Sequence, residues 1–184
     1  MPTEDFVDLC HEMGVQTGYD LGKLIEIPEH PPLAFRVDGD GRAEQVLDGL
    51  TIPNGAGWSP DGRSLYFLSA RTGVQQVWRT DADGSWPLQM TQSDDSQGGL
   101  AASRDGKWIY FTQDNGGDEY YDIYRVPTSG GAVERVTNTP TLSERGLVPG
   151  PSNGLMALSV KKKSEAQSNI ATIDSQGNVK ALTA

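Results

Sequence analysis

The densest group of side chains that could do chemistry is acidic and lies in the middle of the chain. Asp114, Asp118, Glu119 and Asp122 lie within one short stretch. Carboxylate oxygens of this kind bind calcium, and they also pair with the amino group of a peptide. Their spacing does not fit an EF-hand loop, and the intervening glycine pair, 116–117, is typical of a solvated turn. These four residues are therefore the candidate binding site, with an ordinary solvated loop as the alternative.

A second motif, Gly150 to Gly154 around Ser152, matches the Gly-x-Ser-x-Gly pattern of hydrolases. A nucleophile elbow needs a strand before the serine, a helix after it and a histidine later in the chain. Here strand-like residues follow the motif, and both His11 and His30 precede it. We therefore predict no catalytic residue.

Metal ligation by the softer side chains is also disfavoured. Cys10 is the single cysteine, so the chain forms no internal disulfide and no cysteine-based zinc site. Cys10 and His11 are adjacent, and adjacent residues on a helix point in different directions. The basic run 161–163 predicts an exposed turn that discourages edge pairing.

Composition narrows the classes of partner. Asp and Glu number 25 against 15 Lys and Arg, giving a formal charge of -10. Such a chain repels phosphate backbones, so nucleic acid is excluded as an expected partner. No apolar run approaches the length of a membrane span, and the N-terminus has no signal-peptide pattern. We expect a cytoplasmic protein without a membrane partner.

A repeat of roughly 45 residues determines the predicted fold. Residues 57–67 return as 101–111, and a degenerate third copy covers 150–158. Each copy predicts two strands around an Asp-Gly or Asn-Gly turn, followed by two further strands. Four antiparallel strands per period of this length are typical of a β-propeller blade.

We therefore predict an all-β fold, a partial β-propeller of about three and a half four-stranded antiparallel blades, with a short helical segment before it. The helical N-terminal segment covers 1–30, and the propeller covers 31–184. The predicted blades are a half blade at 31–47 and full blades at 48–91, 92–137 and 138–184. Large aromatic residues recur at equivalent strand positions, and we expect them to fill the space between blades: Trp58, Tyr66, Phe67, Trp78, Trp108, Tyr110, Phe111 and Tyr124.

Two family resemblances follow from the repeat. Residues 59–67, with the Asp-Gly turns after the third strands, resemble TolB-type WD-like propeller repeats. Residues 114–126 resemble the propeller of prolyl oligopeptidase-family serine peptidases, and together the likeness covers 56–184. In that family the propeller gates access to a separate α/β-hydrolase domain. The resemblance implies a non-catalytic module that binds a peptide or protein, without a cofactor.

A further stretch, 36–67, is similar to the gluconolactonase and senescence-marker-protein propellers. It contains the Pro-Asn-Gly segment in which that family's asparagine binds the catalytic divalent metal. The resemblance places Asn54 at that position and implies, as an alternative function, a metal-dependent hydrolase. No counterpart of the family's other ligands is evident, and a cation such as calcium wants six or more oxygens.

Residues 5–26 resemble the C-terminal helices of hydroxymethylglutaryl-CoA lyases. Three likenesses in one short chain leave a third alternative, a structural fragment or artificial mosaic without selected activity. An incomplete ring of blades also exposes apolar blade faces, which predicts self-association as an alternative to a peptide or protein ligand.

Overall fold

The structure is a computed structural model that describes residues 34–37, 40, 42–47, 55–85, 87–150 and 154–183. The chain divides into two compact units, Met1–Pro53 and Asn54–Ala184. In the first unit, β1 (Ala34–Val37) and β2 (Ala43–Leu47) form an antiparallel pair. The predicted helical segment at 1–30, with its lyase-like stretch, lies outside the described residues.

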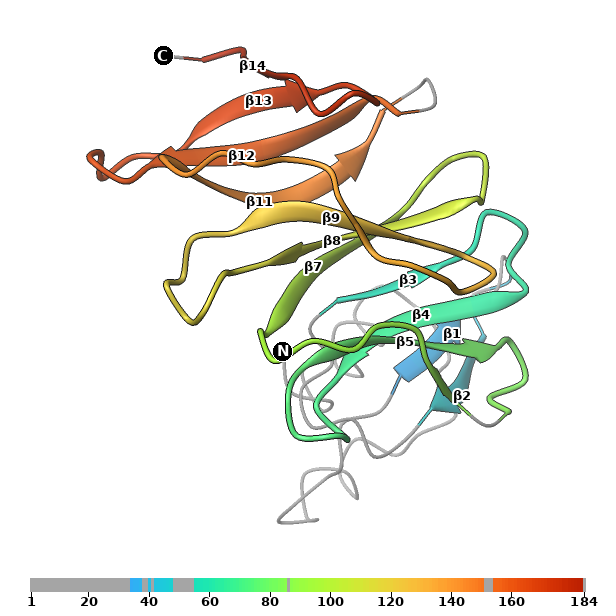
Figure 1. The fold of residues 1–184 in the computed structure, drawn as a ribbon. Coiled ribbons are helices and arrows are strands. Elements are labelled where there is room, and N and C mark those ends of the chain that lie inside the picture. The colour runs from blue at the N-terminus through green and yellow to red at the C-terminus, as the bar shows by residue number, and fades with distance from the viewer. Residues whose placement is uncertain are drawn as a thin grey trace, which may run out of the picture. The chain divides into compact units, whose positions relative to one another are not determined.

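The second unit consists of three four-stranded antiparallel sheets, each with its strands in sequence order (Figure 1). The first blade contains β3 (Ala56–Trp58), β4 (Ser64–Ser69), β5 (Gln76–Asp81) and β6 (Leu88–Gln89). The second contains β7 (Gln97–Ala102), β8 (Trp108–Gln113), β9 (Asp122–Pro127) and β10 (Glu134–Arg135). The third contains β11 (Leu142–Pro149), β12 (Met156–Lys162), β13 (Asn169–Ile173) and β14 (Val179–Ala181). The predicted fold class, all-β with propeller blades, is confirmed.

The repeated Asp-Gly turns fold in the same way in the first two blades. Ser59 Oγ donates to Asp61 Oδ1 at 2.6 Å, and Ser103 Oγ donates to Asp105 Oδ1 at 2.7 Å. The same serine oxygen accepts the backbone N–H that opens the next strand, at 2.9 Å in both blades. Gly62 has a φ of 68°, a conformation that side chains with a Cβ rarely adopt. The sequence Ser-x-Asp-Gly thus closes the hairpin of each blade.

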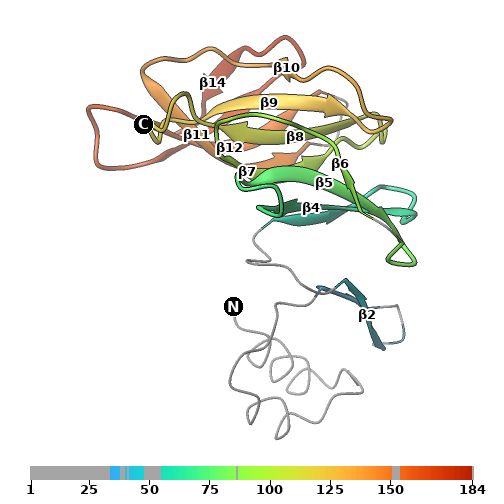
Figure 2. The same ribbon diagram turned by 60° about the horizontal axis from the view of Figure 1, so that its bottom comes forward.

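Apolar side chains fill the spaces between successive blades. Alternate residues of a strand point to opposite faces, so each blade has one face toward its predecessor and one toward its successor. Tyr66 and Val77 of the first blade pack on Ile109 and Phe111 of the second. The next cluster follows the same plan and joins these residues of the second and third blades: Tyr110, Ile123, Met156, Leu158, Val160, Ala171 and Ile173. β7 contacts both β3 and β11, so the first strands of the three sheets adjoin one another. Figure 2 shows β7 near β11 of the third blade.

Five of the eight aromatic residues expected between blades take that position: Tyr66, Phe111 and Tyr124 lie between the first and second blades, and Tyr110 and Trp108 lie between the second and third. Phe67 and Phe111 are fully buried, Tyr66, Tyr110, Trp78 and Tyr124 are buried, and the remaining two, Trp58 and Trp108, are half-buried. Phe111 and Tyr124 stack with ring centroids 5.9 Å apart. Packing between blades is confirmed for those five residues, and burial of this kind contributes most of the stability of such a fold.

A threonine fastens the last strand of each blade to its third strand. Thr91 Oγ1 accepts the backbone N–H of Val77 at 2.9 Å, and Thr137 Oγ1 accepts that of Ile123 at 2.8 Å. Thr183 accepts the N–H of Ile170 at 2.9 Å in the third blade. No helix in the described part of the chain is long and apolar enough to cross a membrane.

Candidate functional site

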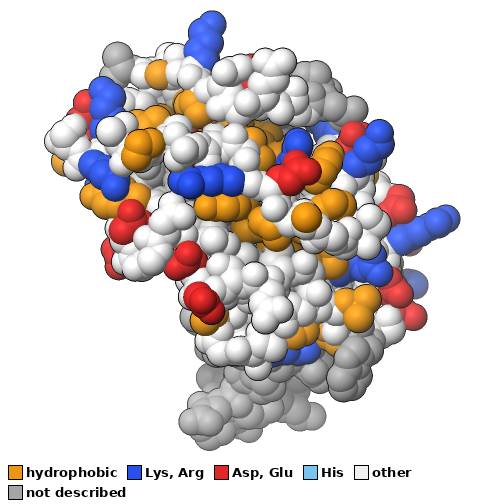
Figure 3. Space-filling model, in the orientation of Figure 1, with side chains coloured by type: hydrophobic (Ala, Val, Ile, Leu, Met, Phe, Trp, Pro, Cys, Tyr) orange, Lys and Arg blue, Asp and Glu red, His pale blue; other side chains and the backbone are white. Residues whose placement is uncertain are grey.

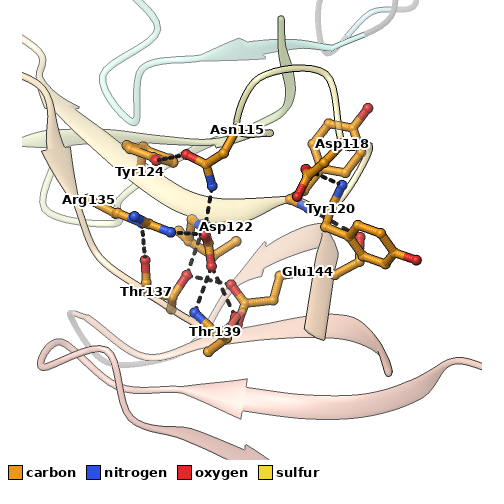
Figure 4. A network of polar contacts seen from close by, with 12 residues as sticks. Asn115, Asp118, Tyr120, Asp122, Tyr124, Arg135, Thr137, Thr139 and Glu144 are labelled. Carbon is orange, nitrogen blue, oxygen red and sulfur yellow. Dashed lines mark hydrogen bonds and ion pairs between the residues drawn. The ribbon is translucent and has the colours of Figure 1, made fainter. Parts of the chain in front are cut away.

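A network of polar side chains occupies the junction between the second and third blades (Figure 4). Asp122, at the start of β9, accepts hydrogen bonds from the backbone N–H and the hydroxyl of Thr139, at 2.9 and 3.0 Å. Its second carboxylate oxygen forms a short ion pair with Arg135 and accepts from Asn115 at 3.4 Å. Asp122 is only 4% exposed, so these contacts compensate the cost of burying its charge.

Glu144 of β11 completes this network from the third blade. It is fully buried and accepts a hydrogen bond from Thr137 at 2.5 Å. Its other oxygen lies 3.0 Å from the hydroxyl of Thr139. The corresponding junction of the first and second blades uses Gln97, whose Oε1 accepts from Thr91 at 2.6 Å. One junction is therefore closed by a neutral amide and the other by an acid.

Asp122 and Glu144 both contact the hydroxyl of Thr139, and this shared contact bears on whether Glu144 carries a proton. The Thr139 hydroxyl has one proton and lies 3.0 Å from both Asp122 Oδ1 and Glu144 Oε1. Both contacts are hydrogen bonds only when one carboxyl group carries a proton, and Asp122 is already ion-paired with Arg135. Burial raises the pKa of Glu144, hydrogen bonds from Thr137 and Thr139 oppose the rise, and the charge of Asp122 adds to it. A proton on Glu144 would make both contacts hydrogen bonds, and the raised pKa favours Glu144 over Asp122 as its carrier.

A cavity of about 410 Å³ lies on the other side of β11, against the loop that joins β8 to β9. The loop reaches β11 because the backbone N–H of Glu144 donates to the carbonyl of Tyr121 at 2.8 Å. The cavity lining combines acidic, basic, hydroxyl and aromatic side chains: Asp118, Glu119, Tyr120, Ser143, Arg145, Ser159, Lys161, Lys163 and Ser168. A volume of this size suits one small ligand or the end of a chain.

Two cations of the cavity are held against aromatic rings. The guanidinium of Arg145 lies 4.2 Å from the ring centroid of Tyr121, and the ammonium of Lys163 lies 3.7 Å from that of Tyr120. Lys163 also pairs with Asp118 at 3.7 Å. The backbone N–H of Tyr120 donates to Asp118 at 3.0 Å and is the main cause that lowers the pKa of Asp118. Asp118 is therefore ionised at neutral pH.

Basic and hydrophobic side chains are interspersed on one surface of the molecule. Figure 3 shows Lys and Arg side chains among exposed hydrophobic ones over the part occupied by the second and third blades. Three of the most exposed large hydrophobic residues belong to the third blade, namely Val148, Ile170 and Leu182. Ile170 is 48% exposed, whereas its counterparts Val77 and Ile123 are fully buried under the following blade.

The four acidic residues predicted as a site do not gather around one point. Asp118 and Glu119 line the cavity, and Asp122 belongs to the network on the other side of β11. Asp114 is buried, and its Oδ1 has no hydrogen-bond partner. Within the described ranges, no three His, Cys, Asp or Glu side chains are placed to hold one metal ion.

Two other predicted positions, Asn54 and Ser152, lie outside the described residues. The basic residues of the cavity, Arg145, Lys161 and Lys163, do not belong to the site predicted from the sequence. Lys161 was assigned to an exposed turn, but it belongs to β12, where it pairs with Ser143 of β11. The alternation of polar and apolar residues along 156–161 is the signal that places Lys161 in a strand.

Comparison with known proteins gives a family and a fold. The model of the SMP-30/Gluconolactonase/LRE-like region matches residues 20–153, well over half of the chain. The uncharacterized protein Atu1656 of Agrobacterium fabrum is 35% identical over 83 residues, which are 45% of this chain and 28% of that protein. The resemblance of 36–67 to gluconolactonase propellers is thereby confirmed at the level of the family.

Solved structures agree with the other two propeller resemblances. TolB from Acinetobacter baumannii is 25% identical, with a TM-score of 0.70 over 83% of this chain and 38% of that chain. Prolyl oligopeptidase B from Galerina marginata is 14% identical, with a TM-score of 0.54 over 75% of this chain and 22% of that chain, and shows the fold alone. This chain therefore spans about a fifth to two fifths of the length of these relatives. The lyase-like resemblance of 5–26 receives no support.

Proposed function

Since the chain belongs to the SMP-30/gluconolactonase/LRE-like family of propellers, we propose that it acts as a non-catalytic module that binds a peptide or a peptide segment of a protein. The observation that carries the proposal is the cavity between the β8–β9 loop and the third blade. Its lining offers acidic groups, basic groups and hydroxyls within one concave space. A peptide end, which carries both signs of charge and many hydrogen-bonding groups, matches such a lining.

The residues predicted as a site support this function in part. Asp118 and Glu119 stand on one wall of the cavity and suit an amino group or a basic side chain. Tyr120 adds an aromatic surface, and tyrosine combines contact area with a hydrogen-bonding hydroxyl. Asp114 and Asp122 take no part, because both are buried and Asp122 is engaged by Arg135.

Peptide binding is tested with the whole chain and a synthetic library of tetrapeptides that have free termini. Equilibrium dialysis followed by mass spectrometry identifies the peptides that the protein retains. We expect a retained subset, and we expect the double variant Arg145→Gln/Lys161→Gln to lose it. The control is Lys180→Gln, which removes an exposed lysine outside the cavity. Equal recovery of all peptides with and without protein would refute the proposal.

The second candidate function is a metal-dependent lactone hydrolase, and the family match that spans Asn54 favours it. The test is hydrolysis of glucono-δ-lactone at pH 7 with added calcium or zinc, against a chelator control. A metal-dependent rate that Asn54→Ala abolishes would support this function. A rate equal to that of buffer with the same metal would exclude it.

A further inference from the structure

The register of β11 and β12 places two positive charges on one diagonal of the sheet. Arg145 lies opposite Ser159, and Lys161 lies opposite Ser143. All four side chains share one face, because Glu144 and Val160, between them, point to the opposite face. Diagonal neighbours of this kind are about 7–8 Å apart, within reach of one another's long side chains.

Neither of these two charges forms a close ion pair with a described residue. The described ion pairs include neither Arg145 nor Lys161, whereas Lys163 pairs with Asp118 and Lys162 with Glu165. Stacking on Tyr121 keeps the guanidinium of Arg145 in place. At about 7–8 Å the two like charges repel each other, and an anion that contacts both would offset this repulsion. The cavity is thus polarised, with fixed positive charge over β11 and β12 and negative charge on the β8–β9 loop.

We infer that Arg145 and Lys161 form a subsite for the C-terminal carboxylate of a bound peptide, an inference that rests on the proposed function. A guanidinium binds a carboxylate through two parallel hydrogen bonds, and an ammonium adds a third donor. The hydroxyls of Ser143 and Ser159, which complete the two cross-strand pairs, are further donors in the same cavity. All four side chains offer N–H or O–H groups to an acceptor that carries only oxygens.

The charge of the whole protein favours a carboxylate over a polyanion. The net charge of -10 repels multiply charged ligands, and screening limits that repulsion for a single charge inside a local positive field. Asp118 and Glu119 border the same cavity and would repel a dianionic phosphate more strongly than a carboxylate. The same two acids attract a basic side chain or the amino terminus of a short peptide, which orients the chain across the cavity.

The test compares each retained tetrapeptide with its C-terminal amide, using calorimetric titration of the unmodified protein. We expect amidation to weaken binding about tenfold or more, since a charged hydrogen bond contributes roughly 1.5–3 kcal/mol. Lys161→Met should weaken binding of the free acid by a similar factor while leaving the amide unchanged. Lys161→Arg should restore the preference for the acid, and Lys180→Met should alter neither form.

The outcomes separate this inference from the proposed function. Peptides that bind as tightly when amidated would overturn the carboxylate subsite and leave peptide binding intact. Retention of no peptide would overturn the proposed function itself. The comparison of acid with amide uses the natural sequence, so it does not depend on the folding of any variant.

Discussion

Replacement of Glu144 by glutamine tests the assignment of a proton to the junction of the second and third blades. Gln97 occupies the equivalent position at the other junction, where its Oε1 accepts from a threonine. In Glu144→Gln, the amide oxygen would accept from Thr137, and the amide N–H would donate to Thr139. The Thr139 hydroxyl would then donate to Asp122, so every member of the network keeps a partner.

The sign of the pH effect follows from the raised pKa of Glu144. A carboxyl whose pKa is higher in the folded state contributes stability that is fully present below its unfolded value of 4.5 and is lost as pH rises through the folded value. Each unit of elevation corresponds to about 1.4 kcal/mol. Glutamine cannot ionise, so the variant should match the wild type within about 1 kcal/mol at low pH and exceed it at pH 8.

The assay is urea unfolding followed by tryptophan fluorescence from pH 4 to pH 8, with the wild-type free energy subtracted from that of the variant. Glu134→Gln is the control, because Glu134 is an exposed partner of Arg125, and it should shift the free energy of unfolding by less than about 1 kcal/mol. A difference for Glu144→Gln that does not change with pH would show that folding leaves the pKa of Glu144 at its unfolded value. A variant less stable than the wild type at pH 8 would refute the reasoning entirely.

The remaining predictions concern stability. Phe111→Ala should lower the free energy of unfolding by about 3–5 kcal/mol in the same urea assay, because Phe111 is fully buried between two blades. Gly154→Ala should destabilise more than Gly62→Ala in thermal unfolding: both have positive φ, but only at Gly154 would the new Cβ overlap a neighbour, Ser175. Equal losses would contradict that account. Asp61→Asn should reduce the fall of stability below pH 3.8, since hydrogen bonds, chiefly from Ser59, lower the pKa of Asp61 and its stabilisation is lost as pH falls through the folded value.

Local signals were sufficient to predict the blades. The serine, aspartate and glycine of each hairpin interact within a few residues, so the turn at 59–62 and its copy at 103–106 can be recognised from sequence. The alternation of large apolar residues then predicts which side chains lie between blades. Both features involve residues that lie close together in the sequence, so a single sequence is enough to recognise them.

The cavity could not be predicted in the same way. Arg145 and Lys161 meet because β11 and β12 pair in one register, and that register shifts between Arg145 and Val148. A one-residue slip would turn Lys161 to the opposite face of the sheet. The acidic stretch was recognised, but its sequence spacing did not show that Asp118 and Glu119 line the cavity whereas Asp122 bonds to Thr139 and Arg135. Strand pairing and contacts between blades bring the lining residues of the cavity together, and no local sequence pattern predicts such contacts.

The threonines that fasten the last strand of the first and second blades also bond to the next blade, and this matters while the chain is being synthesised. Thr91 closes the first blade, but its hydroxyl donates to Gln97, which belongs to the second. Thr137 closes the second blade and donates to Glu144 of the third. During synthesis, a blade that has fully left the ribosome still lacks its final hydrogen-bond acceptor until the first strand of its successor emerges. The first and second blades are therefore each completed by a hydrogen bond to the blade that is translated after them.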